Sequence, residues 1–122
     1  MDNKEFSQIL EKRTKKFAVD TIRLSSGIRN TSETLIIKKQ ITRSSGSIGA
    51  NYREANSSRS TADFKNKIRI CESEASETQY WLEIIQELNW ANGDQINCLI
   101  KEAGELLALY TSIGNKLRKN NN

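Results

Sequence analysis

The chain has 122 residues, no Pro, 6 Gly and a formal net charge of +4, which suits a single domain with an all-α fold. Its longest uninterrupted apolar run has five residues, 106–110, against about 20 needed to span a bilayer. We therefore expect no membrane-spanning helix. The first eight residues, MDNKEFSQ, lack the order of a secretory signal, so we expect a cytoplasmic protein with free thiols.

Capping signals divide the chain into four predicted helices, at residues 3–26, 31–56, 60–91 and 94–119. The predicted N-terminal caps pair a polar residue with an acidic one three positions later: Asp2 with Glu5, Asn30 with Glu33, and Ser60 with Asp63. Asp94 caps the last helix, and Gly27 and Asn92-Gly93 are the predicted terminators. Short connections make consecutive helices antiparallel. The expected architecture is an antiparallel up-down four-helix bundle, one domain over residues 1–122.

Apolar residues mark the core side of the first two helices. In the first they are Phe6, Leu10, Phe17, Ile22 and Leu24. In the second they recur at steps of three and four with two small residues: Leu35, Ile37, Ile41, Ser44, Ile48, Tyr52 and Ala55. Gly and Ser over residues 44–50 lower helix propensity, so a loop is the alternative there. The unbroken step from Ile41 through Ile48 to Tyr52 favours a helix, with small residues that let a neighbour approach closely.

The third and fourth helices have the clearest seams. The third alternates steps of four and three, with Phe64, Ile68, Cys71, Ala75, Thr78, Leu82 and Ile85. The fourth presents Ile96, Leu99, Ala103, Leu106, Tyr110, Ile113 and Leu117. Towards its end the third helix is apolar on more than one side, which predicts burial against more than one neighbour. The candidate oligomer anchors there are Tyr80, Trp81, Ile84 and Leu88.

Several short blocks of sequence, in this order and spacing, resemble a known family: SIGANYREA at 47–55, Arg59-Ser60, Ala62-Asp63-Phe64, and EASETQYWLEII at 74–85. The resemblance covers roughly residues 30–118 and is to the bacterial four-helix-bundle proteins of ribosomal RNA intervening sequences, the S23 ribosomal protein family. It implies a small antiparallel bundle that assembles into a homopentameric ring, with ribosome or RNA association suggested for some relatives.

Catalytic and metal sites have little support in the composition. The chain has no His, which removes the commonest general base and the partner of a Ser or Cys nucleophile. Five glutamates of the third helix are spread around it rather than convergent, and Cys71 and Cys98 are too few to close a zinc site. We therefore expect neither an enzyme nor a cofactor nor a metal site.

The charge distribution offers a nucleic-acid surface. Residues 1–70 carry 15 Lys and Arg against 7 Asp and Glu, whereas residues 71–105 carry 1 against 8. A basic region of this kind is typical of proteins that bind RNA or DNA phosphates. The candidate contacts are Lys12, Lys16, Arg23, Lys39, Arg43, Arg53 and Arg59. No aromatic residues interleave with them, so a stacking platform for bases is not expected.

A protein-binding scaffold or adaptor ring, without nucleic-acid binding, is the alternative function. The third helix is apolar on several sides around Tyr80 and Trp81, which supplies anchors for a partner. The contrast between basic and acidic helices suits a head-to-tail contact between copies. The positions of Arg43, Arg53 and Arg59 discriminate between the two hypotheses. Pairing with carboxylates of the third helix at an interface favours the scaffold, whereas one open face favours nucleic acid.

Overall fold

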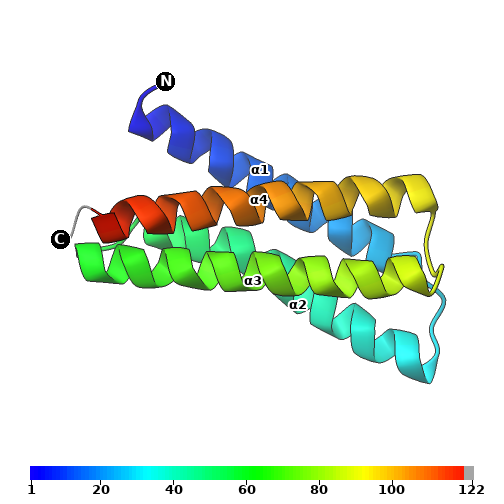
Figure 1. Ribbon diagram of the computed structural model, residues 1–122. Coiled ribbons are helices and arrows are strands. Elements are labelled where there is room, and N and C mark those ends of the chain that lie inside the picture. The colour runs from blue at the N-terminus through cyan, green and yellow to red at the C-terminus, as the bar shows by residue number, and fades with distance from the viewer. Residues whose placement is uncertain (120–122) are drawn as a thin grey trace.

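The computed structural model describes residues 1–119 and consists of four helices: α1 (Asn3–Ser26), α2 (Ser32–Ala55), α3 (Thr61–Glu87) and α4 (Gly93–Lys119). The short connections alternate between the two ends of the molecule, so consecutive helices run antiparallel (Figure 1). The predicted all-α, up-down four-helix bundle is therefore confirmed. Residues 120–122, included in the predicted domain, lie outside the described part. None of the four helices is long and apolar enough to cross a membrane.

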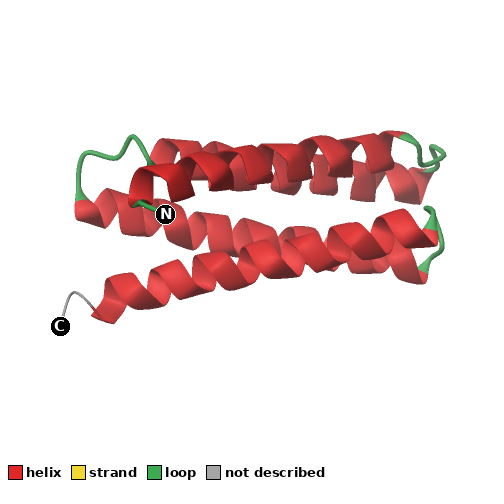
Figure 2. Ribbon diagram, turned by 90° about the horizontal axis from the view of Figure 1, so that it is seen from above, coloured by secondary structure: helices red, strands yellow, loops and turns green. Residues whose placement is uncertain are grey.

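The helices form two layers, with the α1–α2 hairpin on one side and the α3–α4 hairpin on the other (Figure 2). Each helix packs against the next, and α1 also meets α4, over a shorter stretch than the other neighbouring pairs. The two hairpins cross at an angle, so the N-terminal ends of α1 and α2 extend past the α3–α4 layer (Figure 1). One side of each hairpin consequently faces outward.

The helix starts follow capping chemistry, and two of the three predicted pairs are confirmed. The amide of Glu5 donates to Asp2, and that of Asp63 to Ser60. The predicted pair at the start of α2 is wrong, because Thr31 and Thr34 form a reciprocal capping box there. At α4 the side chain of Asn92 accepts from the amides of Asp94 and Gln95, so Asn92 is the cap in place of the predicted Asp94, and Gly93 lies inside the helix.

Helix α3 ends at Glu87, earlier than the predicted residue 91. Asn89 has a left-handed backbone, with φ 56°. Its amide donates to the carbonyl of Gln86, and the amide of Trp90 donates to that of Ile85. This is a Schellman motif with Asn in the position that Gly usually takes.

One core runs through all four helices. On α2 the predicted seam residues from Ile41 to Ala55 are buried, and on α3 those from Ile68 to Ile85 are buried. Residues 44–50 are helical, so the loop alternative is wrong. The predicted apolar side of α1 needs correction: Ile22 is exposed, and Thr14 and Thr21 are fully buried instead. Leu35 of α2 is likewise exposed, which places it outside the predicted seam.

Candidate nucleic-acid interface

The outward side of α1 carries three of the predicted basic contacts. Residues of α1 that face the core recur from Leu10 to Ser25 at steps of three and four. Lys12, Lys16 and Arg23 recur at steps of four and seven on the opposite side of the helix, because each residue advances about 100°. All three side chains are exposed, as is Lys15 beside them.

Helix α2 continues the same surface. Arg53 Nε lies 3.5 Å from Glu11 Oε1, and a Cβ added at Gly49 would lie 3.0 Å from Thr14 Oγ1. Extending this antiparallel register brings Arg23 level with Lys39. We call the outward side of the α1–α2 hairpin the basic face. Its cations are Lys12, Lys15, Lys16, Arg23, Lys39, Arg53 and, at the edge toward α3, Arg43, all exposed.

Carboxylates of the same chain neutralise three of these cations. Lys16 Nζ lies 2.6 Å from Asp20 Oδ2, and Arg53 pairs with Glu11. Arg43 reaches across to α3, where it lies 3.0 Å from Glu74 and also pairs with Glu77. Within residues 1–119, Lys12, Lys15, Arg23 and Lys39 have no such ion pair. These four form the available positive charge of the basic face.

Arg43 is part of a network that ties α2 to α3. Its hydrogen bond with Glu77 raises the pKa of the guanidinium. The indole Nε1 of Trp81 donates to Glu77 at 2.9 Å, and this bond, followed by the bond from Arg43, lowers the pKa of the Glu77 carboxyl. Arg43 therefore meets the carboxylates of α3 as the scaffold hypothesis required, but within one chain rather than between copies.

Arg59 and Arg13 lie outside the basic face. Arg59 is exposed in the connection between α2 and α3, where no ion pair holds it within the described residues. Arg13 points to α4, with Nε 2.7 Å and Nη2 2.6 Å from the two Glu102 oxygens. The hydrogen bond to Glu102 raises the pKa of Arg13. Arg13 is thus a clamp between α1 and α4.

The four candidate anchors differ in exposure. Tyr80 and Leu88 are 56 % and 52 % exposed, so both are available to a neighbour. Trp81 and Ile84 are half-buried, and Trp81 packs against the chain's own core. Two further exposed apolar residues, which were not among the candidate anchors, lie at the start of α2: Leu35 and Ile36.

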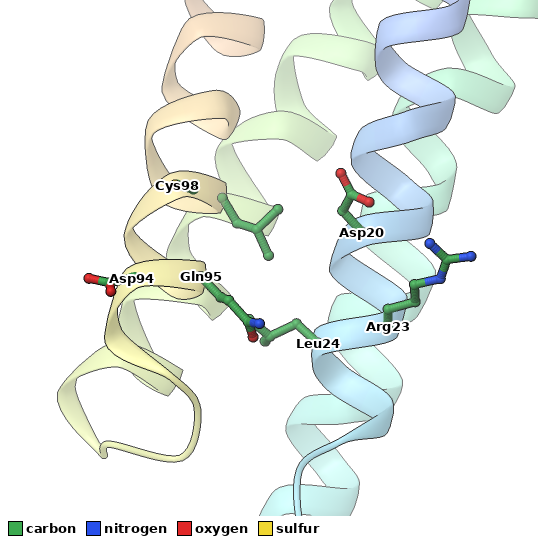
Figure 3. Close-up of a pocket in the computed structure, with 7 residues that line it drawn as sticks. Asp20, Arg23, Leu24, Asp94, Gln95 and Cys98 are labelled. Carbon is green, nitrogen blue, oxygen red and sulfur yellow. The ribbon is translucent and has the colours of Figure 1, made fainter.

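The hollows of the surface are shallow grooves between helices. One of about 500 Å³ lies between α1 and α4 (Figure 3). There Leu24 and Gln95 point toward each other, whereas the Arg23 guanidinium points away from α4. A second, of about 510 Å³, runs along the basic face and includes Gly46 and Ala50. Among residues 1–119, no three Cys, Asp or Glu side chains gather as a metal ion would require.

Comparisons with known proteins agree with this architecture. A family model described as 23S rRNA-intervening sequence protein matches residues 7–112. A crystal structure from Bacteroides thetaiotaomicron, of a protein with unknown function from the S23 ribosomal protein family, is similar with a TM-score of 0.81 and 35% sequence identity. The similarity covers 89% of this chain and 97% of that one. None of the curated proteins compared with the chain matches it.

Proposed function

Because the chain belongs to the 23S rRNA-intervening sequence protein family, we propose that it is a non-enzymatic, cytoplasmic helical-bundle protein that associates with RNA, including ribosomal RNA. The contact surface is the basic face of the α1–α2 hairpin. The family description names ribosomal RNA, and the basic face supplies chemistry suited to it.

One observation carries this proposal: Lys12, Lys15, Arg23 and Lys39 are exposed on one side of the molecule without an ion pair among the described residues. When these cations bind phosphates, they displace only the counterions condensed on the nucleic acid, and the release of these counterions drives binding. Lys16, Arg43 and Arg53 contribute less, because a phosphate has to compete with a carboxylate already in place. Binding of this kind is largely independent of base sequence.

The test is RNA binding by a charge-removal variant, measured by fluorescence anisotropy over a range of salt concentrations. The variant Lys12→Gln, Arg23→Gln, Lys39→Gln should bind much more weakly, with a salt slope smaller by about 2–3 because three phosphate contacts are lost. Equal binding by wild type and variant would remove the basic face from the proposal.

A matched control removes the same charge from the other hairpin. Arg69, Lys101 and Lys116 are exposed on α3 and α4 and have no ion pair within the described residues. Replacing these three with Gln should leave the salt slope near that of the wild type. Circular dichroism melting of both variants verifies that the bundle is intact.

A protein scaffold is the second candidate function, and exposed apolar side chains favour it. Leu35 and Ile36 are 53 % and 64 % exposed, close to the 56 % of Tyr80, and such residues commonly mark protein contacts. Affinity purification of the tagged chain from its native cells, with RNA sequencing and protein identification together, separates the two functions. One protein retained at high salt without RNA enrichment would establish the scaffold.

We also propose that copies of the chain assemble into a ring, with five subunits as the family resemblance implies. A closed ring repeats the basic face around its axis, so the modest positive charge of each subunit becomes a large positive surface. Assembly therefore strengthens phosphate binding without any new contact in the subunit.

A further inference from the structure

We infer that the nucleic acid held by the basic face is a double helix rather than a single strand. This inference rests on the RNA association proposed above and adds the form of the nucleic acid. Three features of the face carry it: where its aromatic residues point, where its backbone polar groups are, and how its free cations are arranged.

The basic face has no aromatic side chain on which a base can stack. Helices α1 and α2 contain three aromatic residues, Phe6, Phe17 and Tyr52. Phe17 and Tyr52 are each 2 % exposed, and Phe6 packs against the core. The exposed Tyr80 lies on α3. Proteins that bind single strands combine a cationic groove with aromatic platforms, and here only the cations are present.

The backbone of the face is also closed to base edges. Lys12, Lys15 and Lys39 lie inside two long helices, whose amide and carbonyl groups bond one another, whereas Arg23 lies in the last turn of α1. The connections that leave backbone groups free are at the ends of the hairpin (Figure 2). A flexible single strand consequently finds few backbone partners here for its exposed bases, whereas a duplex has already paired its bases and presents phosphates outward.

The free cations spread over two helices rather than along one line. Lys12 and Arg23 are separated by about 16 Å along α1, and the register places Lys39 of α2 level with Arg23. A duplex carries one charge per about 1.7 Å of its axis, so a duplex of this length has about nine phosphates around it, roughly twice as many as one strand has. Because its phosphates are more closely spaced, a duplex gains more binding free energy than a single strand from the same four cations.

Small side chains occupy part of the surface between the cations of α1 and those of α2. The groove there is lined by the small residues Ala18, Gly46 and Ala50 and also by the larger Glu11, Lys15, Arg53 and Glu54, and a Cβ added at Gly46 would meet nothing within 4 Å. At Ala18, Gly46 and Ala50 no large side chain stands between the two helices, so a rigid cylinder can lie across both of them there. The shared chemistry is two rows of phosphates, which RNA and DNA duplexes both provide.

The experiment compares one fluorescent 20-nucleotide RNA of mixed, unstructured sequence, single-stranded or paired with its complement, against the matching DNA duplex. We expect the RNA duplex to bind at least about tenfold more tightly than the single strand at the same salt concentration. Similar affinity for the DNA duplex supports recognition of phosphates alone. A preference for the RNA duplex assigns the site to RNA, and both outcomes support a double helix.

Two other outcomes overturn separate claims. A single strand that binds as tightly as the duplex refutes this inference and leaves RNA association standing. No binding to any of the three refutes the proposed function itself. The Lys12, Arg23, Lys39→Gln variant should lose duplex affinity, whereas the Arg69, Lys101, Lys116→Gln control should retain it, which ties the preference to the basic face.

Discussion

The two thiols of the chain lie in opposite environments. Cys71 is buried in the core, with Sγ 3.4 Å from the carbonyl oxygen of Ile48, whereas Cys98 is exposed on α4. Burial disfavours the thiolate and raises the pKa of Cys71 to about 12. Since the thiolate is the reactive form, Cys71 is chemically inert in the folded chain.

We predict that Ellman's reagent at pH 8 labels one thiol per native chain and two after denaturation in guanidinium. The Cys98→Ser variant should show no rapid labelling. Rapid labelling of Cys71 in the native protein would contradict its burial. Near pH 9.0 the Cys71 thiol of the unfolded chain loses its proton, whereas the thiol of the native chain keeps it. The stability that Cys71 contributes is therefore complete below pH 9 and declines as pH rises towards 12.

Two glycines of α2 differ in what surrounds them. A Cβ at Gly46 would meet nothing within 4 Å, whereas one at Gly49 would lie 3.0 Å from Thr14 Oγ1 and 3.3 Å from its Cβ. The Thr14 hydroxyl is held by the carbonyls of Leu10 and Glu11, so it cannot easily move aside. Gly49 therefore leaves the space that Thr14 of α1 occupies against α2.

Alanine at these two positions should change stability in opposite directions. Gly46→Ala gains helix propensity and should raise the free energy of unfolding by about 0.5–1 kcal/mol. Gly49→Ala meets Thr14 and should lower it by about 1–3 kcal/mol through overpacking. Urea unfolding followed by circular dichroism measures both. Equal stabilisation by the two substitutions would show that the α1–α2 contact is looser than described.

Among the helices, α3 could be predicted most completely, because its buried positions from Ile68 to Ile85 are almost all apolar. Helix α1 was the least predictable. Thr14 and Thr21 fill core positions that an apolar pattern does not mark, and Thr14 does so by bonding its hydroxyl to its own helix. The end of α3 was also missed, since Asn89 takes the left-handed conformation usually signalled by Gly.

The Arg13 clamp should contribute modestly to the attachment of α1. Arg13 and Glu102 side chains are 33% and 27% exposed, so solvent screens the pair. We expect Arg13→Gln to lower the free energy of unfolding by up to about 1 kcal/mol, and by less at high salt. Lys12→Gln is the matched control, because Lys12 is exposed without an ion pair among the described residues. The same loss in both variants, measured by urea unfolding, would rule out a specific clamp.

For the molecule as a whole, exposure of the candidate cations was predictable and their partners were not. All seven are on the surface, as expected for charged residues on the polar sides of amphipathic helices. Arg43 pairs with Glu74, 31 residues away, and Arg53 with Glu11. Such pairs depend on the packing of the hairpins, which one helix's pattern does not encode. The same packing explains Trp81, which belongs to the core of its own chain.

Self-association should use the exposed apolar residues at one end of the molecule. Thr78 Oγ1 lies 2.9 Å from Ser44 Oγ, and extending this register brings Ile36 of α2 level with Gln86 of α3, between Ile84 and Leu88. Tyr80 of α3 and Leu88, the residue directly after α3, are each four residues from Ile84. We predict that multi-angle light scattering finds an oligomer at micromolar concentration, and that Tyr80→Gln with Leu88→Gln shifts it towards the monomer without lowering the melting temperature.

Trp81→Ala should behave differently, because Trp81 packs against the core and donates to Glu77. It should lower the melting temperature of the subunit whether or not copies separate. Ile9→Gln is the control, since Ile9 is 51% exposed near the start of α1, at the other end of the bundle. A monomeric wild-type chain would refute assembly. An oligomer that persists in the Tyr80, Leu88 variant and dissociates in Ile9→Gln would move the contact to the opposite end, where the chain begins.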